Sequence, residues 1–149
     1  MLRWGMTLEQ GNELFGKYLG DWGGDVIEWR FDAVKNGEVV RSVVKGGDPV
    51  LLSLEAMPSH TLLREGDTYD MAAVRIRVLD ENGNTAPYAQ LPVLLTLEGD
   101  AELVGPSAIT AEGGMCGTYI RTLGRPGRAK LTVSAERAGS VSLEFGIGK

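Results

Sequence analysis

Hydrophobic and polar residues alternate over much of the chain, beginning near Val26. In the segment "VIEWRFDAV", Ile27, Trp29 and Phe31 fall on one side and charged residues on the other. A period of two is typical of a β-strand with one buried face. The dipeptide Asn36-Gly37 and the segment "EVVRSVVK" follow. Asn-Gly favours a hairpin, because both central residues of a type I′ turn need positive φ. We therefore predict a β-hairpin over residues 25–45, with Trp29 in its core.

The segment "VRIRVLDENGNTAPYAQLPVLLTLEG", residues 74–99, repeats the pattern. It alternates, reaches Asn82-Gly83 and alternates again, which predicts a second hairpin. Its first strand places Val74, Ile76 and Val78 inward. Arg75 and Arg77 point outward, and we interpret them as solvated charge, with an anion site as the alternative.

About seven short strands follow Pro58, separated by Gly, Pro, Asn and Asp. That number and spacing are typical of an immunoglobulin-type sandwich. We predict an all-β fold in which an immunoglobulin-like Greek-key β-sandwich, residues 58–149, follows a partial module of helix and hairpin, residues 1–57. The late strands add further residues to the predicted core: Leu131, Val133, Val141, Leu143 and Phe145.

The start of the chain has a helical pattern instead. Thr7 is followed three residues later by Gln10, which makes a capping box because each side chain can bond to the backbone N–H at the other's position. We predict a short helix within residues 7–19, although Gly11 and Gly16 weaken it. A glycine-rich loop, "GDWGGD" at residues 20–25, then carries Trp22.

Composition argues against several classes of function. Twenty acidic residues against fifteen basic ones leave a net charge of -5, and no basic run is present. This balance argues against nucleic acid and against anionic membranes as partners. No apolar run approaches the roughly 18 residues of a spanning helix. No N-terminal signal pattern is visible, which favours the cytoplasm over secretion if residue 1 is the native N-terminus.

Cys116 and His60 are each the only residue of their type. One cysteine cannot form an intrachain disulfide, and one cysteine with one histidine falls short of the four ligands of a usual zinc site. Serine- or cysteine-histidine catalysis would need His60, which lies beside a proline in "MPSHT". We expect no catalytic residue, metal or cofactor in this chain, and interpret Cys116 as a small core or turn residue.

Two longer segments resemble a known family. "DMAAVRIRVLDENGNTAPYAQLPVLLTLEGDAELVGP" and "GGMCGTYIRTLGRPGRAKLTVSA" are similar to the C-terminal immunoglobulin-like domain of glycoside hydrolase family 2 enzymes, the β-galactosidase-like and β-glucuronidase-like proteins. The segment "LFGKYLGDWGGDVIEWRFDAVKNGEVVRSVVK" resembles the later half of the module that precedes this domain in a subset of those enzymes.

The resemblance implies a non-catalytic role. Retaining glycosidases use two carboxylates about 5 to 5.5 Å apart. In this family they lie on a (β/α)₈ barrel, which needs about 250 residues. The chain is too short for such a barrel, and none of its glutamates matches the family's barrel motifs. No catalytic residue is therefore carried over.

Tyr18 and Trp22 are the candidate ligand-binding residues. Sugars stack their C–H faces on aromatic rings, and Asp21 or Asp25 could accept hydrogen bonds from hydroxyl groups. The alternative is that Trp22 packs against the hairpin or against a neighbouring domain.

Two functions remain open at this point. The first is a non-catalytic C-terminal accessory region of a family 2 glycosidase, with the remaining domains of the parent enzyme as partners. The second is a freestanding carbohydrate-binding or adhesin-type immunoglobulin-like module. An adhesin would more often show tandem repeats, and none is visible.

Overall fold

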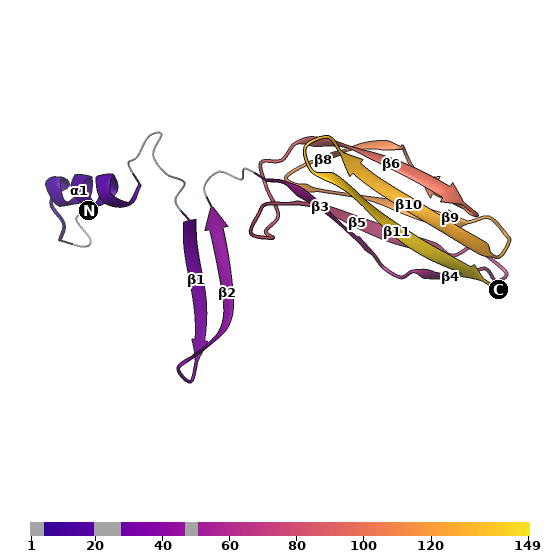
Figure 1. Cartoon of the computed structure of the whole chain (residues 1–149), viewed down its shortest axis with the longest axis horizontal. Helices are drawn as coiled ribbons and strands as arrows, with labels where there is room; N and C mark the ends of the chain where they lie inside the picture. Colours follow the sequence, from indigo (N-terminus) through magenta and orange to yellow (C-terminus); the bar gives the residue numbers. More distant parts are fainter. Residues whose placement is uncertain (1–4, 20–27, 47–50) are drawn as a thin grey trace. The chain divides into compact units, whose positions relative to one another are not determined.

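The computed structural model describes residues 5–19, 28–46 and 51–149. It divides into two compact units, Met1–Asp48 and Pro49–Lys149. The division comes before the expected boundary at Pro58, because the strand Ser53–Pro58 pairs with a strand of the second unit. Figure 1 shows the elements of each unit.

The first unit contains the helix and the hairpin that the sequence predicts. Helix α1 (Leu8–Tyr18) begins at Thr7, and both bonds of the capping box to Gln10 are present. Strands β1 (Glu28–Lys35) and β2 (Glu38–Gly46) pair antiparallel. Asn36 and Gly37 join them with φ of 54° and 84°. Both turn residues therefore have the positive φ that an Asn-Gly hairpin turn requires.

The prediction that Trp29 is a core residue is wrong for the described part of this unit. Trp29 and Phe31 share one face of the hairpin, as their spacing predicts, but they are 46% and 58% exposed. Every residue of β1 is exposed. A two-stranded sheet has no second layer of its own, so alternation alone cannot bury its apolar face.

The second unit is an all-β sandwich of two sheets, as predicted. Its strands are β3 (Ser53–Pro58), β4 (Leu62–Arg64), β5 (Met71–Leu79), β6 (Leu91–Gly99), β7 (Ala101–Val104), β8 (Ala108–Ala111), β9 (Met115–Thr122), β10 (Gly127–Ala135) and β11 (Gly139–Gly148). One sheet has the order β4-β11-β10-β6-β8 and the other β3-β5-β9-β7. The short strand β4, which lies parallel to β11, was not predicted.

The predicted inward residues form the core between the two sheets. Val74, Ile76 and Val78 are fully buried, and so are Leu131 and Val133. Phe145 is the largest of the fully packed side chains at 2% exposure, whereas Val141 and Leu143 are only partly buried at its margin.

The second predicted hairpin, over residues 74–99, is wrong. Strand β5 pairs with β3 and β9, whereas β6 pairs with β10 and β8 in the opposite sheet. Only Gly83 of the Asn82-Gly83 pair has positive φ, so no type I′ turn forms. The Asp80 carboxylate instead accepts hydrogen bonds from the backbone N–H groups of Asn82 and Asn84. The chain then crosses between the sheets with Ala86 and Ala89 buried.

Candidate functional site

The predicted sugar-contact pair is only partly described. Tyr18 is the last residue of α1, its ring is 47% exposed, and the Lys17 ammonium lies 5.3 Å from the ring centre. Trp22, Asp21 and Asp25 lie outside the described residues. An exposed ring beside a cation is compatible with sugar stacking, but the pairing of Tyr18 with Trp22 stays a prediction.

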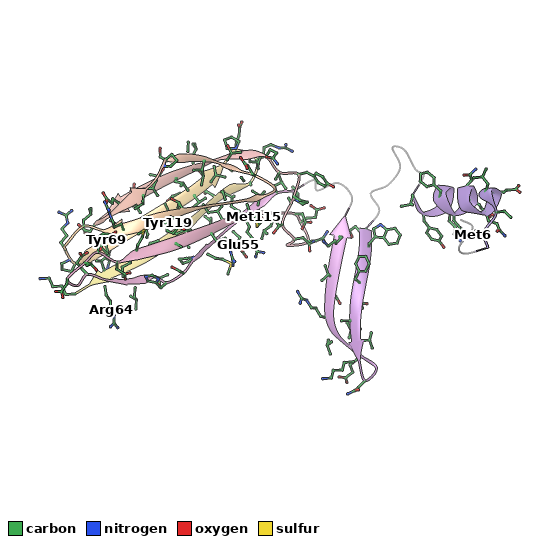
Figure 2. All side chains as sticks on the ribbon, turned by 180° about the vertical axis from the view of Figure 1, so that it is seen from behind. Met6, Glu55, Arg64, Tyr69, Met115 and Tyr119 are labelled. Carbon is green, nitrogen blue, oxygen red and sulfur yellow. The ribbon has the colours of Figure 1, made fainter. Side chains whose placement is uncertain are left out.

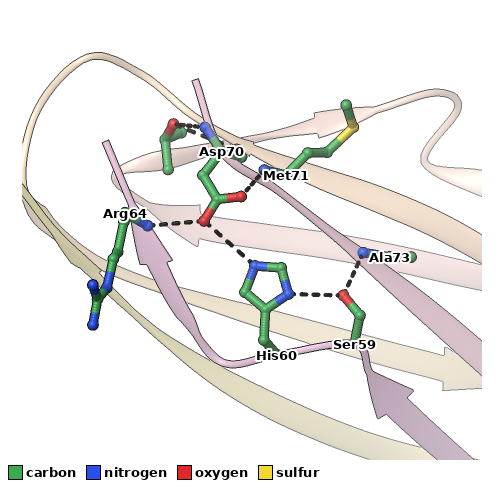
Figure 3. A network of polar contacts seen from close by, with 7 residues as sticks. Ser59, His60, Arg64, Asp70, Met71 and Ala73 are labelled. Carbon is green, nitrogen blue, oxygen red and sulfur yellow. Dashed lines mark hydrogen bonds and ion pairs between the residues drawn. The ribbon is translucent and has the colours of Figure 1, made fainter. Parts of the chain in front are cut away.

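A polar network that the sequence did not predict links β3, β4 and β5 (Figure 3). The Ser59 hydroxyl lies 3.0 Å from His60 Nδ1, and His60 Nε2 lies 3.4 Å from Asp70 Oδ2. Ser59 Oγ accepts a hydrogen bond from the Ala73 backbone N–H at 3.1 Å. The Ser59 oxygen thus acts as acceptor for Ala73, and its hydroxyl proton can be donated to His60 Nδ1. In that tautomer His60 carries its proton on Nε2 and can donate it to the Asp70 carboxylate.

Asp70 is the centre of this network. Its carboxylate accepts the Arg64 backbone N–H at 2.9 Å and the Met71 backbone N–H at 2.8 Å. The hydrogen bond from the Arg64 N–H is the main cause that lowers the pKa of the Asp70 carboxyl group. The hydrogen bond from the Met71 N–H and the nearby His60 lower this pKa further. The backbone N–H of Asp70 donates a hydrogen bond to Thr122 Oγ1 on β9 at 3.0 Å. The network thus ties the β3–β4 and β4–β5 connections to the sheet.

Ser59, His60 and Asp70 are linked in the order of a hydrolytic triad. The surroundings of these three residues differ from those of a hydrolytic active site. A triad also needs N–H donors for an oxyanion and a pocket for substrate. Three hollows on the described surface, of about 460, 410 and 310 Å³, are lined by neither Ser59, His60 nor Asp70. The Arg64 and Met71 amides that an oxyanion hole could use are already bonded to Asp70. We interpret the network as a structural clamp.

The remaining reactive residues do not form a site in the described part of the chain. Cys116 lies on β9, partly buried against the core, and burial raises the pKa of its thiol. The sequence predicted a small core or turn residue at this position, and its place on β9 against the core agrees with the first of these. Among residues 5–19, 28–46 and 51–149, no three His, Cys, Asp or Glu side chains gather as metal ligands. No helix of these segments is long and apolar enough to cross a membrane.

Arg75 and Arg77 both point outward from β5, as predicted, but they differ in their partners. Arg77 donates from Nε to Glu55 Oε2 at 2.6 Å, across the strand pair β3–β5. Arg75 contacts Met57 Sδ at 3.5 Å. The ion pair of Arg77 was not visible in the sequence, since it depends on the register between two strands.

Comparison with known proteins places the sandwich in an enzyme family. Residues 54–144 match the model for "Glycoside hydrolase family 2 C-terminal domain 5". A β-galactosidase from Rhizobium radiobacter is 30% identical over 132 residues, which covers 87% of this chain and 93% of that protein. A β-galactosidase from Thermoanaerobacter pseudethanolicus is 38% identical over 61 residues, covering 41% of this chain and only 8% of that protein.

Solved structures show the same fold. A β-glycosidase from Bacteroides vulgatus superposes with a TM-score of 0.66 at 16% identity, covering 82% of this chain and 17% of that one. The second unit makes up about two thirds of the chain, so both this likeness and the Rhizobium radiobacter alignment extend into the first unit. The family match and these alignments agree in sequence and in fold: the chain belongs to the glycoside hydrolase family 2 C-terminal domain 5 family.

Proposed function

We propose that this chain is a non-catalytic accessory region of a β-galactosidase-like family 2 glycoside hydrolase. It packs on the catalytic barrel of the parent enzyme and shapes it. The observation that carries the proposal is the family match over residues 54–144, because that family is defined as a C-terminal domain of such hydrolases. The small share of longer relatives that the chain covers supports the same view.

The first unit supports packing against further protein. Its hairpin exposes Trp29 and Phe31 on one face, and α1 exposes Leu8, Leu14 and Phe15. An isolated two-stranded hairpin is marginally stable in water at best. Exposed aromatic and aliphatic clusters of this kind usually mark a surface that another element covers.

A deletion in the parent enzyme tests the proposal. The complete enzyme and a version lacking residues 49–149 are compared by thermal unfolding and by hydrolysis of a chromogenic galactoside. We expect the deletion to lower the Tm and to reduce turnover at the assay temperature, because the barrel loses a packing partner. Unchanged Tm and unchanged kinetics would overturn the proposed role.

Tyr18 and Trp22 are proposed, within this role, to add a sugar-stacking surface to the parent's substrate site. The exposed ring of Tyr18 supports the idea. Stacking would act on substrate binding and not on the chemical step, because neither ring exchanges a proton with the sugar.

A further inference from the structure

The outer face of the β3-β5-β9-β7 sheet carries an unusual set of side chains, which we call the methionine face. Strand register places its members in cross-strand rows. Two rows are Glu55–Arg77–Met115 and Met57–Arg75–Gly117. Two more are Ala73–Tyr119–Val104 and Met71–Arg121–Glu102. Figure 2 shows Glu55, Met115, Tyr119 and Tyr69 along the length of the sandwich.

Several large apolar or aromatic side chains are exposed on this face. Met115 and Tyr119 are each 52% exposed, and Met57, Met71 and Val104 are also exposed. Tyr69 borders the face, with the Arg121 guanidinium 5.1 Å from its ring centre. Methionine, tyrosine and arginine are the residue types that protein interfaces favour over other surfaces.

The charges on the methionine face are neutralised at both ends but not in the middle. Arg77 is paired with Glu55 and Arg121 with Glu102. Arg75 lies between these pairs, and the contact that the structure shows for its guanidinium is with Met57 Sδ. Among the described residues, Arg75 therefore stands without a carboxylate partner, beside apolar side chains. Covering it with protein would be costly unless the partner supplies a negative group.

The centre of the face is also hollow. Gly117 is the cross-strand neighbour of Arg75 and contributes no side chain, which leaves a hollow of about 310 Å³ between Arg75 and Tyr119. A Cβ atom at Gly117 would lie 3.1 Å from the Val74 carbonyl oxygen, a tight contact that disfavours a larger residue there. The face thus combines a recess, apolar neighbours and a cation that pairs with no carboxylate of the described segments.

The outer face of the other sheet has a different character. Its cross-strand rows are Glu98–Lys130–Glu144, Thr96–Thr132–Ser142 and Leu94–Ser134–Ser140. Charged and hydroxyl side chains make up most of these rows, and water solvates such groups well. The rows of the methionine face instead mix methionine, tyrosine and valine with ion pairs.

We propose that the methionine face is the surface by which this domain docks on the rest of the parent glycosidase. The partner surface is apolar and carries a carboxylate that meets Arg75. This inference rests on the proposed function and adds the face of contact to it. The chain covers only 17% of the Bacteroides vulgatus enzyme, so such enzymes hold ample further protein to fill this role. A second copy of the chain is disfavoured, because docking about a twofold axis through the centre of the face, at the Met57–Arg75–Gly117 row, would bring Arg75 against Arg75.

Oxidative footprinting locates the covered face. The isolated chain and the complete parent enzyme are exposed to hydroxyl radicals, and oxidation is quantified residue by residue by mass spectrometry. Met57, Met71, Met115 and Tyr119 should be oxidised roughly fivefold or more slowly in the parent, since oxidation follows exposure. Leu62 and Leu94, exposed on the sheet that contains β4 and β6, serve as matched reporters of the other face.

The outcomes separate this inference from the proposed function. Protection of Leu62 and Leu94 with none of the methionine face would overturn the face assignment but leave a packing role intact. Protection of neither face would contradict both. Protection that appears in the isolated chain as its concentration rises, or on addition of galactose, would instead identify a second copy or a sugar as the occupant.

A charge-reversal variant tests the place of Arg75. In the parent enzyme, Arg75→Glu should abolish most of the protection of Met115 and Tyr119, because two carboxylates would then face each other in the contact. Arg128→Glu, the same change on the outer face of the other sheet, should leave that protection as in the wild type. Equal protection in both variants would show that Arg75 has no part in docking.

Discussion

At the scale of single residues, burial and register decide what each side chain contributes. Ile76 is fully buried between the sheets, whereas Arg77 beside it lies on the outer face in an ion pair with Glu55. The alternating pattern of the sequence predicted both orientations. It could not predict the partner of Arg77, because the pairing of β3 with β5 is not encoded in either strand alone.

Replacing Ile76 by alanine should lower the free energy of unfolding by about 2 to 5 kcal/mol, the usual range for truncating a buried aliphatic side chain. Arg77→Ala is the matched neighbour and should cost at most about 1 kcal/mol, since ion pairs that water still reaches contribute little. Urea denaturation of both variants gives the comparison. Equal losses would contradict the face assignment of β5.

The Asp70 network gives a pH-dependent contribution to stability. The folded-state pKa of Asp70 is lowered, so its ionised form stabilises the fold above the unfolded pKa of about 3.9. That contribution is lost as the pH falls below this value through the lowered pKa. Asp70→Asn removes an acceptor for the Arg64 or Met71 amide and should lower stability at pH 7.

The difference in the free energy of unfolding between the wild type and Asp70→Asn should therefore shrink as the pH falls below about 4. Unfolding curves of the two proteins at pH 7, 5, 4 and 3 measure it. A difference that stays constant over this range would show that the Asp70 carboxylate does not contribute through its charge.

Trp22 carries the test of the proposed sugar contact. In the parent enzyme, Trp22→Ala should raise the KM for a galactoside with little change in kcat, because stacking acts on binding. The stability of the 149-residue chain should hardly change. A loss of several kcal/mol from the chain would identify Trp22 as a core residue and end the sugar-contact idea.

At the scale of elements, the two Asn-Gly pairs behave differently. Both Asn36 and Gly37 have positive φ and close a hairpin, whereas at Asn82-Gly83 only the glycine does. The second pair is the same dipeptide, but it lies in a longer connection that changes sheet. Most strand positions and the local β1–β2 pairing were therefore predictable. The partners of β5 and β6 were not, because their pairing depends on residues far apart in the chain.

Strand β3 shows the same limit. The sequence predicted a domain boundary at Pro58, yet this residue forms the end of β3, paired with Val74. Proline is tolerated at an edge strand, where its missing N–H can face away from the partner strand, and β3 is an edge of its sheet. Local sequence signals a break at proline whether or not an edge is available.

Gly114 and Gly83 provide a matched test of the close backbone approach between Gly114 and Ala86, which lies in the connection from β5 to β6. Their φ angles are 76° and 75°. A Cβ at Gly114 would approach the carbonyl group of Ala86 far inside van der Waals contact, whereas one at Gly83 meets nothing within 4 Å. Gly83→Ala should cost only the backbone strain of about 1 to 2 kcal/mol, and Gly114→Ala clearly more. Similar losses in chemical denaturation would contradict the close approach of the two segments.

At the scale of the whole molecule, the described chain consists of a well-packed sandwich and a first unit whose apolar surfaces are exposed. The sandwich has a core of its own, whereas α1 and the hairpin do not bury their apolar faces in the described structure. Family membership and this contrast agree with the accessory role proposed above. The catalytic carboxylates would then come from the parent's other domains.

Hydrolysis of a chromogenic galactoside by purified components tests this account most directly. The 149-residue chain is assayed alone, and a parent enzyme lacking these residues is assayed with and without the chain added back. We predict no turnover by the chain alone, and a gain in turnover or thermal stability when it joins the truncated parent. Turnover by the chain alone that one substitution among its own glutamates abolishes would contradict the account.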